Sequence, residues 1–299
     1  MILPPDRSHI DTEQRNSRCD DLHSLSVQQC VHRLVEEDKA VHRAMQQAEE
    51  GISRFIEAAS PGFCQGGRLV YFGAGTSGRL GVLDASEAPP TFQVERGRVV
   101  GIIAGGDSSL RTSSEGKEDE PDGAIDELEQ LQLQPNDTLV GIAAGGTTPY
   151  VRGGLEWASS LPHPPLTAMI SCSTVEPPRG VAHMIILSTG PEVLTGSTRM
   201  KAGTATKLAL NTISTTLMIQ EGRVYRNLMI DLKASNAKLR DRAARIYSQL
   251  TGATRQEAFL QLKQADGELK TALVVHHKNV SLQKARSLLT KHSVAELLE

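Results

Sequence analysis

Aromatic side chains are scarce in this chain of 299 residues, which has one Trp, four Tyr and five Phe. Proteins that bind single-stranded nucleic acids stack bases on aromatic rings, and few rings are available here for that purpose. The formal net charge of −3 provides no basic surface for DNA or RNA either. The composition therefore argues against nucleic acid as a partner.

Patterns typical of metal sites and membrane segments are also missing. The four cysteines form no CxxC pair, and the nine histidines form no HExxH motif. No signal-peptide pattern opens the chain, and no apolar run reaches the ~18 residues of a membrane span. We therefore expect a cytoplasmic protein with reduced thiols, no membrane contact and no metal.

Five short segments predict the strands of a parallel sheet. Each is apolar through most of its length rather than alternating, which is typical of strands buried on both faces. They lie at residues 68–72, 98–104, 138–144, 166–171 and 184–187, with helix-forming segments between them at 77–85, 122–131 and 150–160. This alternation predicts an α/β fold with a doubly wound, parallel, five-stranded sheet. A long helix at about 199–220, capped by Gly222, would close it.

Helical patterns flank the sheet on both sides. Residues 1–20 are polar and are expected to form a loose arm, and residues 24–59 favour two helices over one. Residues 225–248 are typical of one charged helix. A small three-helix unit is expected at about 254–264, 267–276 and 281–290, with Thr254 and Ser281 as N-caps. The expected division is an N-terminal arm with helices over 1–56, the sheet domain over 57–222 and a helical C-terminal region over 223–299.

The first strand leads into the loop Gly73-Ala-Gly-Thr-Ser-Gly-Arg79. Gly73-x-Gly75-x-x-Gly78 is a weak dinucleotide fingerprint. A dinucleotide site also needs an acidic residue at the end of the second strand to hold a ribose, and the nearest candidate, Asp107, lies later in the chain than this pattern expects. Thr76 and Ser77 instead place hydroxyls at a helix start, where backbone N–H groups and the helix dipole attract phosphate. A tight turn without a ligand is the third interpretation.

Two further loops carry hydroxyls at similar places. Ala144-Gly-Gly-Thr-Thr-Pro149 follows the third strand, and Gly196-Ser-Thr-Arg-Met-Lys-Ala-Gly203 opens the long helix. Ordinary helix capping explains any one of these loops. Three together indicate one crevice at the carboxyl edge of the sheet.

Acidic residues are the candidates for acid–base chemistry. Glu87 stands before Pro89 and Pro90, which are expected to end the first helix of the sheet domain, and Glu115 and Glu118 lie in a charged stretch. The residue types alone favour solvated surface acids at all three positions.

Long segments of the chain resemble the N-acetylmuramic acid 6-phosphate etherases, a family of the sugar isomerase (SIS) domain superfamily. The resemblance covers nearly the whole chain and is most specific over Gly73–Phe92. Other matching segments are Thr12–Asn16, Glu37–Lys39, Glu115–Asp119, Gly190–Ala205 and Asn227–Asp231. It implies cleavage of the lactyl ether of N-acetylmuramate 6-phosphate, with no metal or redox cofactor, by a homodimer that recycles cell-wall sugars in the bacterial cytoplasm.

The resemblance also implies roles for particular residues. Glu87 and Glu118 stand at the positions of the family's catalytic glutamates, as proton donor and base respectively. The residues expected to bind the phosphosugar are Gly75, Thr76, Ser77, Thr147, Thr148, Ser197, Thr198 and Lys201. Paired carboxyl groups suit a reaction that removes a C2 proton and protonates a departing ether oxygen.

One loop departs from the family pattern. The family usually has Ala-Ser-Gly-Arg-Thr-Pro-Tyr where this chain has Ala144-Gly-Gly-Thr-Thr-Pro-Tyr150. The loss of a serine and an arginine predicts weaker phosphate binding or a shifted substrate. Two alternatives remain open: a non-catalytic sugar-phosphate-binding regulator, similar to the glucokinase regulatory protein, and an aldose–ketose sugar-phosphate isomerase.

Overall fold

The computed structural model of the chain describes residues 6–112, 115–232 and 236–299. The chain folds into two compact units. One comprises residues up to Ser86 together with Gly97–Leu217, and the other comprises Glu87–Arg96 together with Met218–Glu299. Helices α2 (Gly75–Phe92) and α5 (Lys201–Gln220) each contribute residues to both units.

The first unit is built on a parallel sheet of five strands in the order β2-β1-β3-β4-β5. The strands are β1 (Leu69–Gly73), β2 (Val99–Ile103), β3 (Thr138–Ile142), β4 (Leu166–Ser171) and β5 (His183–Ile186). Every residue of β1 and β3 is buried, which explains their continuous apolar character. The predicted doubly wound five-stranded sheet is confirmed.

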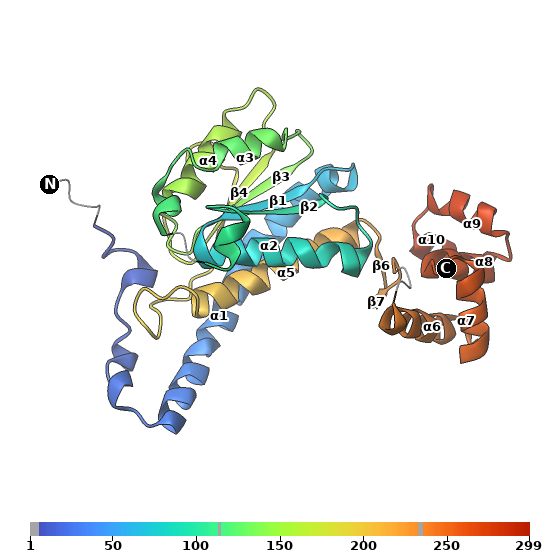
Figure 1. Ribbon diagram of the computed structural model, residues 1–299, viewed down its shortest axis with the longest axis horizontal. Coiled ribbons are helices and arrows are strands. Elements are labelled where there is room, and N and C mark those ends of the chain that lie inside the picture. Colours follow the sequence, from blue (N-terminus) through green and yellow to red (C-terminus); the bar gives the residue numbers. More distant parts are fainter. Residues whose placement is uncertain (1–5, 113–114, 233–235) are drawn as a thin grey trace. The chain divides into compact units, whose positions relative to one another are not determined.

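Helices cover both faces of this sheet (Figure 1). On one face, α3 (Ile125–Gln130) and α4 (Pro149–Ser159) pack on a core that contains Phe72, Leu139 and Met169. On the other face lie α1 (Val27–Cys64), α2 and α5. The helices that follow β1 and β3 therefore lie on opposite faces, which leaves a crevice at the carboxyl ends of these two neighbouring strands.

Helix α1 corrects the prediction of two N-terminal helices, because it is a single helix of 38 residues. A capping box between Ser26 and Gln29 begins it. Gly51 lies inside it, although glycine in a helix interior costs about 1 kcal/mol relative to alanine. Buried side chains on both sides of that glycine, among them Ala48, Ile52 and Phe55, outweigh this local cost.

Helix α2 corrects a second prediction, that Pro89 and Pro90 end it. The helix continues through both prolines to Phe92. Proline lacks an N–H group and crowds the preceding turn, so it normally stops a helix. Here Ala88 and Phe92, on either side of the two prolines, are both buried, and this burial holds the last turn together.

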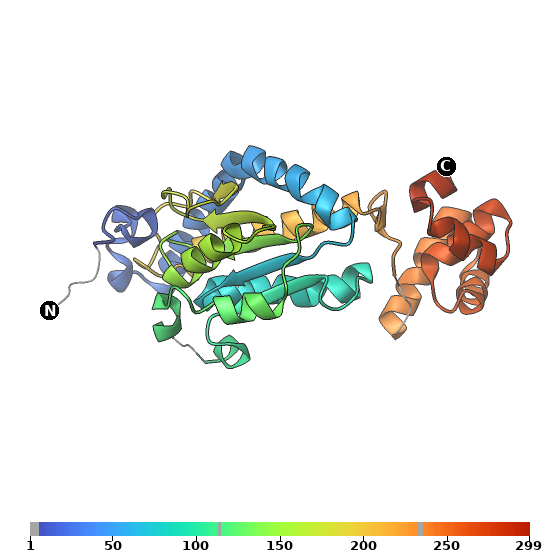
Figure 2. The same cartoon turned by 90° about the horizontal axis from the view of Figure 1, so that it is seen from above.

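The N-terminal arm, residues 6–24, is ordered, which corrects the prediction of a loose segment. It contains three short 3-10 turns, η1 (Asp11–Glu13), η2 (Ser17–Cys19) and η3 (Leu22–Ser24). Ile10 and Thr12 are buried, 2% and 0% exposed. Figures 1 and 2 both place the arm at the end of the sheet where α2 and α5 begin.

The second unit is helical after a short hairpin. The strands β6 (Val224–Tyr225) and β7 (Leu228–Met229) are followed by α6 (Ala237–Thr251), α7 (Arg255–Gln264), α8 (Leu269–Lys278), α9 (Leu282–Leu289) and α10 (Val294–Leu298). The single helix predicted over 225–248 is wrong, because Arg226 takes a left-handed φ of 54° in the hairpin turn. The helices predicted over 254–264, 267–276 and 281–290 and the N-caps Thr254 and Ser281 are confirmed. The prediction of a three-helix unit is incomplete, because a fourth helix, α10, follows them. Within the described ranges, no helix is both long and apolar enough to cross a membrane.

Candidate functional site

Three loops meet around a pocket of about 220 Å³ in the first unit. The β1–α2 loop contributes residues 74–77, and the segment before α5 contributes Gly196 and Thr198. The β3–α4 loop contributes Ala144, Gly145 and residues 147–149. The predicted convergence of the three hydroxyl-bearing loops is thus confirmed. The pocket lies at the carboxyl ends of β1 and β3, where ligands bind in doubly wound sheets.

Close approach of the backbone explains the glycines of the first loop. A Cβ atom on Gly78 would lie 2.5 Å from the Gly73 carbonyl oxygen and 2.7 Å from Ile103 Cγ1. Gly75 has a φ of 53°, which glycine adopts at little cost. Asp107, the acid required by the dinucleotide interpretation, opens η4 (Asp107–Leu110) after β2 and does not line this pocket.

Five hydroxyl groups line the pocket without internal partners. In the described part of the chain, none of their side chains makes a hydrogen bond. They belong to Thr76, Ser77, Thr147, Thr148 and Thr198. Thr148 is the N-cap of α4, yet its side chain makes no capping bond. These groups are therefore available to a polar ligand such as a phosphate.

The start of α5 is not available in the same way. The carboxylate of Glu192, which is fully buried, accepts hydrogen bonds from the backbone N–H groups of Lys201 and Ala202, at 3.0 and 2.8 Å. Burial raises the pKa of Glu192 despite these bonds. Among the three helices that begin at the pocket, α5 thus has its first donors occupied by the protein itself.

Lys201 and Ser197, which we expected to bind substrate, are not among the lining residues. Lys201 is 1% exposed, and its Nζ donates to Glu37 Oε2 at 3.1 Å. The placement favours a structural role for this lysine, and its assignment to substrate binding remains a prediction.

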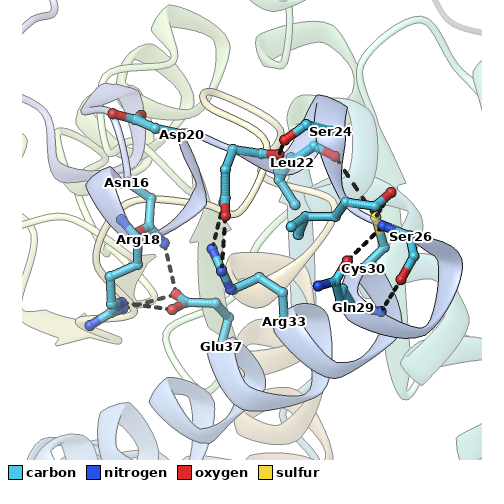
Figure 3. A network of polar contacts seen from close by, with 12 residues as sticks. Asn16, Arg18, Asp20, Leu22, Ser24, Ser26, Gln29, Cys30, Arg33 and Glu37 are labelled. Atoms are coloured by element: carbon cyan, nitrogen blue, oxygen red, sulfur yellow. Dashed lines mark hydrogen bonds and ion pairs between the residues drawn. The ribbon is translucent and has the colours of Figure 1, made fainter.

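Glu37 of α1 joins this lysine to the N-terminal arm. It accepts hydrogen bonds from Asn16 Nδ2 at 2.7 Å and from Arg18 Nε and Nη2 at 2.7 and 2.9 Å (Figure 3). Burial alone would raise the pKa of Glu37, but the bonds from Arg18, Lys201 and Asn16 outweigh it and bring the pKa down to about 2. The arm makes a second contact with α1, in which Arg33 Nη1 donates to Asp21 Oδ1 at 3.0 Å.

Carboxylates reach the pocket from two directions. Glu118 and Asp119 of η5 (Glu115–Asp119) line it, and Glu13 enters from the arm. Glu87 does not line the pocket and is exposed on α2. It follows Gly75 by twelve residues of that helix, about 18 Å along the axis. The side chain of Glu115 lies outside the described part of the structure.

Arg7, Ile10 and Glu13 also line the pocket, although the sequence did not predict them as site residues. Glu13 falls within the matching segment Thr12–Asn16, which was the one available signal. Arg79, which could have added charge to the first loop, instead donates to the backbone carbonyls of Leu110 and Ser109, at 3.1 and 2.6 Å. Within the described residues, no group of three or more His, Cys, Asp and Glu side chains is arranged to hold a metal.

Comparison with known proteins gives close relatives over nearly the full chain. An N-acetylmuramic acid 6-phosphate etherase of Synechococcus sp. (strain CC9902) is 48% identical over 287 residues, which cover 96% of this chain and 90% of that protein. The proteins of the same name from Enterobacter sp. (strain 638) and Yersinia pestis (strain Pestoides F) are each 47% identical over 282 residues and 94% of this chain, and 94% and 95% of their own lengths are covered.

A family model and a solved structure match smaller parts. The model of the glucokinase regulatory protein N-terminal SIS domain matches residues 48–159. The structure of the Escherichia coli CFT073 protein c3406 in complex with A5P aligns at 12% identity and a TM-score of 0.47, over 68% of this chain and 97% of its own.

Proposed function

The chain belongs to the family of N-acetylmuramic acid 6-phosphate etherases, and we propose that its pocket cleaves the D-lactyl ether of that phosphosugar. The products are N-acetylglucosamine 6-phosphate and D-lactate. The observation that carries this proposal is the convergence of five unpaired hydroxyls with the Glu118 carboxylate in one pocket. It supports a site that binds a phosphosugar and also holds a base.

The phosphate is assigned to the first two loops. Thr76 and Ser77 lie in the first turn of α2, and Thr147 and Thr148 precede α4. Helix starts bind anions because free backbone N–H groups and the positive end of the helix dipole lie there. Thr198 extends this set from the third loop, while the α5 start itself is already capped by Glu192.

The chemistry requires a base and an acid. In the open-chain sugar, C1 is an aldehyde, so a base can remove the C2 proton. Elimination then breaks the bond between C3 and the ether oxygen, an acid protonates the departing lactate oxygen, and water adds to C3 of the resulting enal. We assign the base to Glu118, which lines the pocket, and the acid to Glu87. No cofactor is required by this sequence of steps.

The position of Glu87 indicates what the proposed homodimer would contribute to catalysis. A side chain about 18 Å along α2 from the first loop cannot act on a sugar bound at that loop of the same chain. We propose that Glu87 acts in the pocket of a second protomer. Symmetric pairing would then supply one Glu87 to each of the two pockets.

The direct test of the activity is release of D-lactate from N-acetylmuramic acid 6-phosphate. A folded preparation that releases none would refute the etherase assignment and leave the alternative of a non-catalytic sugar-phosphate-binding regulator. For the base, the Glu118→Gln variant should lose exchange of the C2 proton into deuterated water. Exchange at the wild-type rate would remove Glu118 from that role.

Sharing of the site between protomers is tested by complementation. Glu87→Gln and Glu118→Gln are each expected to be inactive. In a mixed dimer, one pocket would combine an intact Glu118 with an intact Glu87 from the other protomer. Random mixing makes half of the dimers mixed, so activity should return to about a quarter of wild type. If Glu87 acts within its own chain, the mixture stays inactive.

The wider role follows from this reaction. We propose that the enzyme acts in the bacterial cytoplasm, where it recycles muramyl sugars released from the cell wall. The partner is a small phosphosugar, without nucleic acid or membrane. Growth on N-acetylmuramic acid as the sole carbon source, with and without the gene, tests this role independently of the mechanism.

A further inference from the structure

The N-terminal arm forms one wall of the pocket. Arg7, Ile10 and Glu13 line it alongside the three loops. The arm is seated on the sheet domain at this point, because Ile10 and Thr12 are buried and the Thr12 N–H donates to Ser173 Oγ at 3.3 Å. This part of the arm therefore belongs to the pocket and is not a free tail.

A second anchor holds the arm a few residues further on. Asn16 and Arg18 both donate to Glu37 (Figure 3). Glu37 also accepts a hydrogen bond from Lys201 at the start of α5. Because the third loop leads directly into α5, the same buried carboxylate ties the arm to one of the three loops. The arm and the loops are thus positioned together.

Arg7 differs from the other arginines of the arm. Arg15 pairs with Asp20 at 2.9 Å, and Arg18 pairs with Glu37 at 2.7 Å. The guanidinium of Arg7 makes no hydrogen bond or ion pair with any described residue. Among the described lining residues it is also the one cationic side chain, facing a pocket that holds Glu13, Glu118 and Asp119.

The substrate of the proposed reaction has two separate anionic groups, the 6-phosphate and the lactyl carboxylate. The hydroxyls of the loops suit the phosphate. The carboxylate must then enter a pocket already lined by three acidic side chains, where an anion without a cation is unfavourable. An arginine binds a carboxylate through two parallel N–H donors, with well-defined geometry.

We propose that Arg7 binds the lactyl carboxylate and so distinguishes the muramyl phosphosugar from phosphosugars that have only a hydroxyl at C3. The assignment rests on the proposed function. Arg7 would thus bind the leaving group. By holding the lactyl carboxylate, it would keep the ether oxygen in position for protonation until lactate is released.

The test compares two ligands that differ at the group in question. Binding of N-acetylmuramic acid 6-phosphate and of N-acetylglucosamine 6-phosphate is measured by calorimetry in a Glu118→Gln background, so that the substrate is not consumed. Adding Arg7→Gln should weaken binding of the muramyl compound about tenfold or more and leave the other affinity unchanged. Arg7→Lys should keep part of the discrimination, because it retains the charge but not the two donors.

Arg15→Gln is the matched control, since it removes an exposed arginine of the same arm that does not line the pocket. It should alter neither affinity. Equal weakening of both ligands by Arg7→Gln would refute the proposal and assign Arg7 to the phosphate, and no weakening of either would also refute it. Failure of the etherase assignment has a different signature, the absence of lactate from the wild-type enzyme.

Discussion

Replacement of Glu37 by glutamine should destabilise the protein through one buried carboxylate. Glu37 is 5% exposed and accepts four hydrogen bonds from three side chains, one of which is the Lys201 ammonium. Its pKa falls from an ordinary 4.5 to about 2 in the folded protein. That difference corresponds to about 3 kcal/mol of folding free energy at neutral pH.

The pH dependence follows from the sign of this shift. A pKa that is lower in the folded state means that the stabilisation is complete above the unfolded value of 4.5 and is lost as the pH falls toward 2. Wild type should therefore exceed Glu37→Gln by about 3 kcal/mol at pH 7, and by about 1 kcal/mol at pH 3.

Urea unfolding at pH 7, 5 and 3 measures this difference. Glu49→Gln, at an exposed position of the same helix, controls for the loss of a charge on α1. A gap between wild type and Glu37→Gln that stays constant from pH 7 to pH 3 would refute the reasoning, because it would mean that the carboxylate charge does not carry the stabilisation.

Two substitutions and one thiol-labelling reaction test the packing of the first unit. Gly78→Ala should lower stability by about 3 kcal/mol in thermal unfolding, because its Cβ would lie 2.5 Å from a backbone oxygen. Gly145→Ser should be accepted, because its Cβ would lie 3.5 Å from the buried, unpaired Thr12 Oγ1. The added hydroxyl should stabilise the fold by about 1 kcal/mol. It should also lower the Michaelis constant for the phosphosugar. Burial raises the pKa of the Cys172 thiol to about 12, so iodoacetamide at pH 8 should label exposed Cys64 and spare Cys172 in the native protein, as read by mass spectrometry.

Each of these has a contrasting outcome. Gly116→Ala, at a glycine with open space around its Cβ, is the control for Gly78→Ala. Equal stability of the two variants would contradict the close contact at Gly78. For Gly145→Ser, a loss of stability would show that the arm and the loop are packed too closely for a serine. For the thiols, labelling of Cys172 at the rate seen in urea would contradict its burial.

The strands and the meeting of three loops could be predicted from the sequence for a physical reason. A strand buried on both faces must be apolar throughout, so its pattern is visible locally. Parallel strands also direct all their carboxyl ends to one edge, which brings the loops after β1 and β3 together once the strand order is known.

Helix ends were less predictable, because they depend on contacts distant in the chain. Gly51, Pro89 and Pro90 each disfavour a helix by a local cost that the sequence makes obvious. The side chains that outweigh this cost, such as Ile52 and Phe92, do so only through the surfaces that bury them. The local sequence therefore shows the cost of glycine or proline in a helix, but not the distant contacts that outweigh this cost.

The sequence alone determined the sheet, the hydroxyl loops and, through its resemblance to a family, the expected chemistry. The tertiary structure was needed to place the arm against the pocket, to pair Lys201 with Glu37 and to separate Glu87 from the first loop. Arg7 and Glu13 precede the first loop by some sixty residues and carry no periodic signal. Their place in the site depends on buried contacts of Ile10, Thr12 and Glu37, and such long-range contacts exist only once the chain has folded.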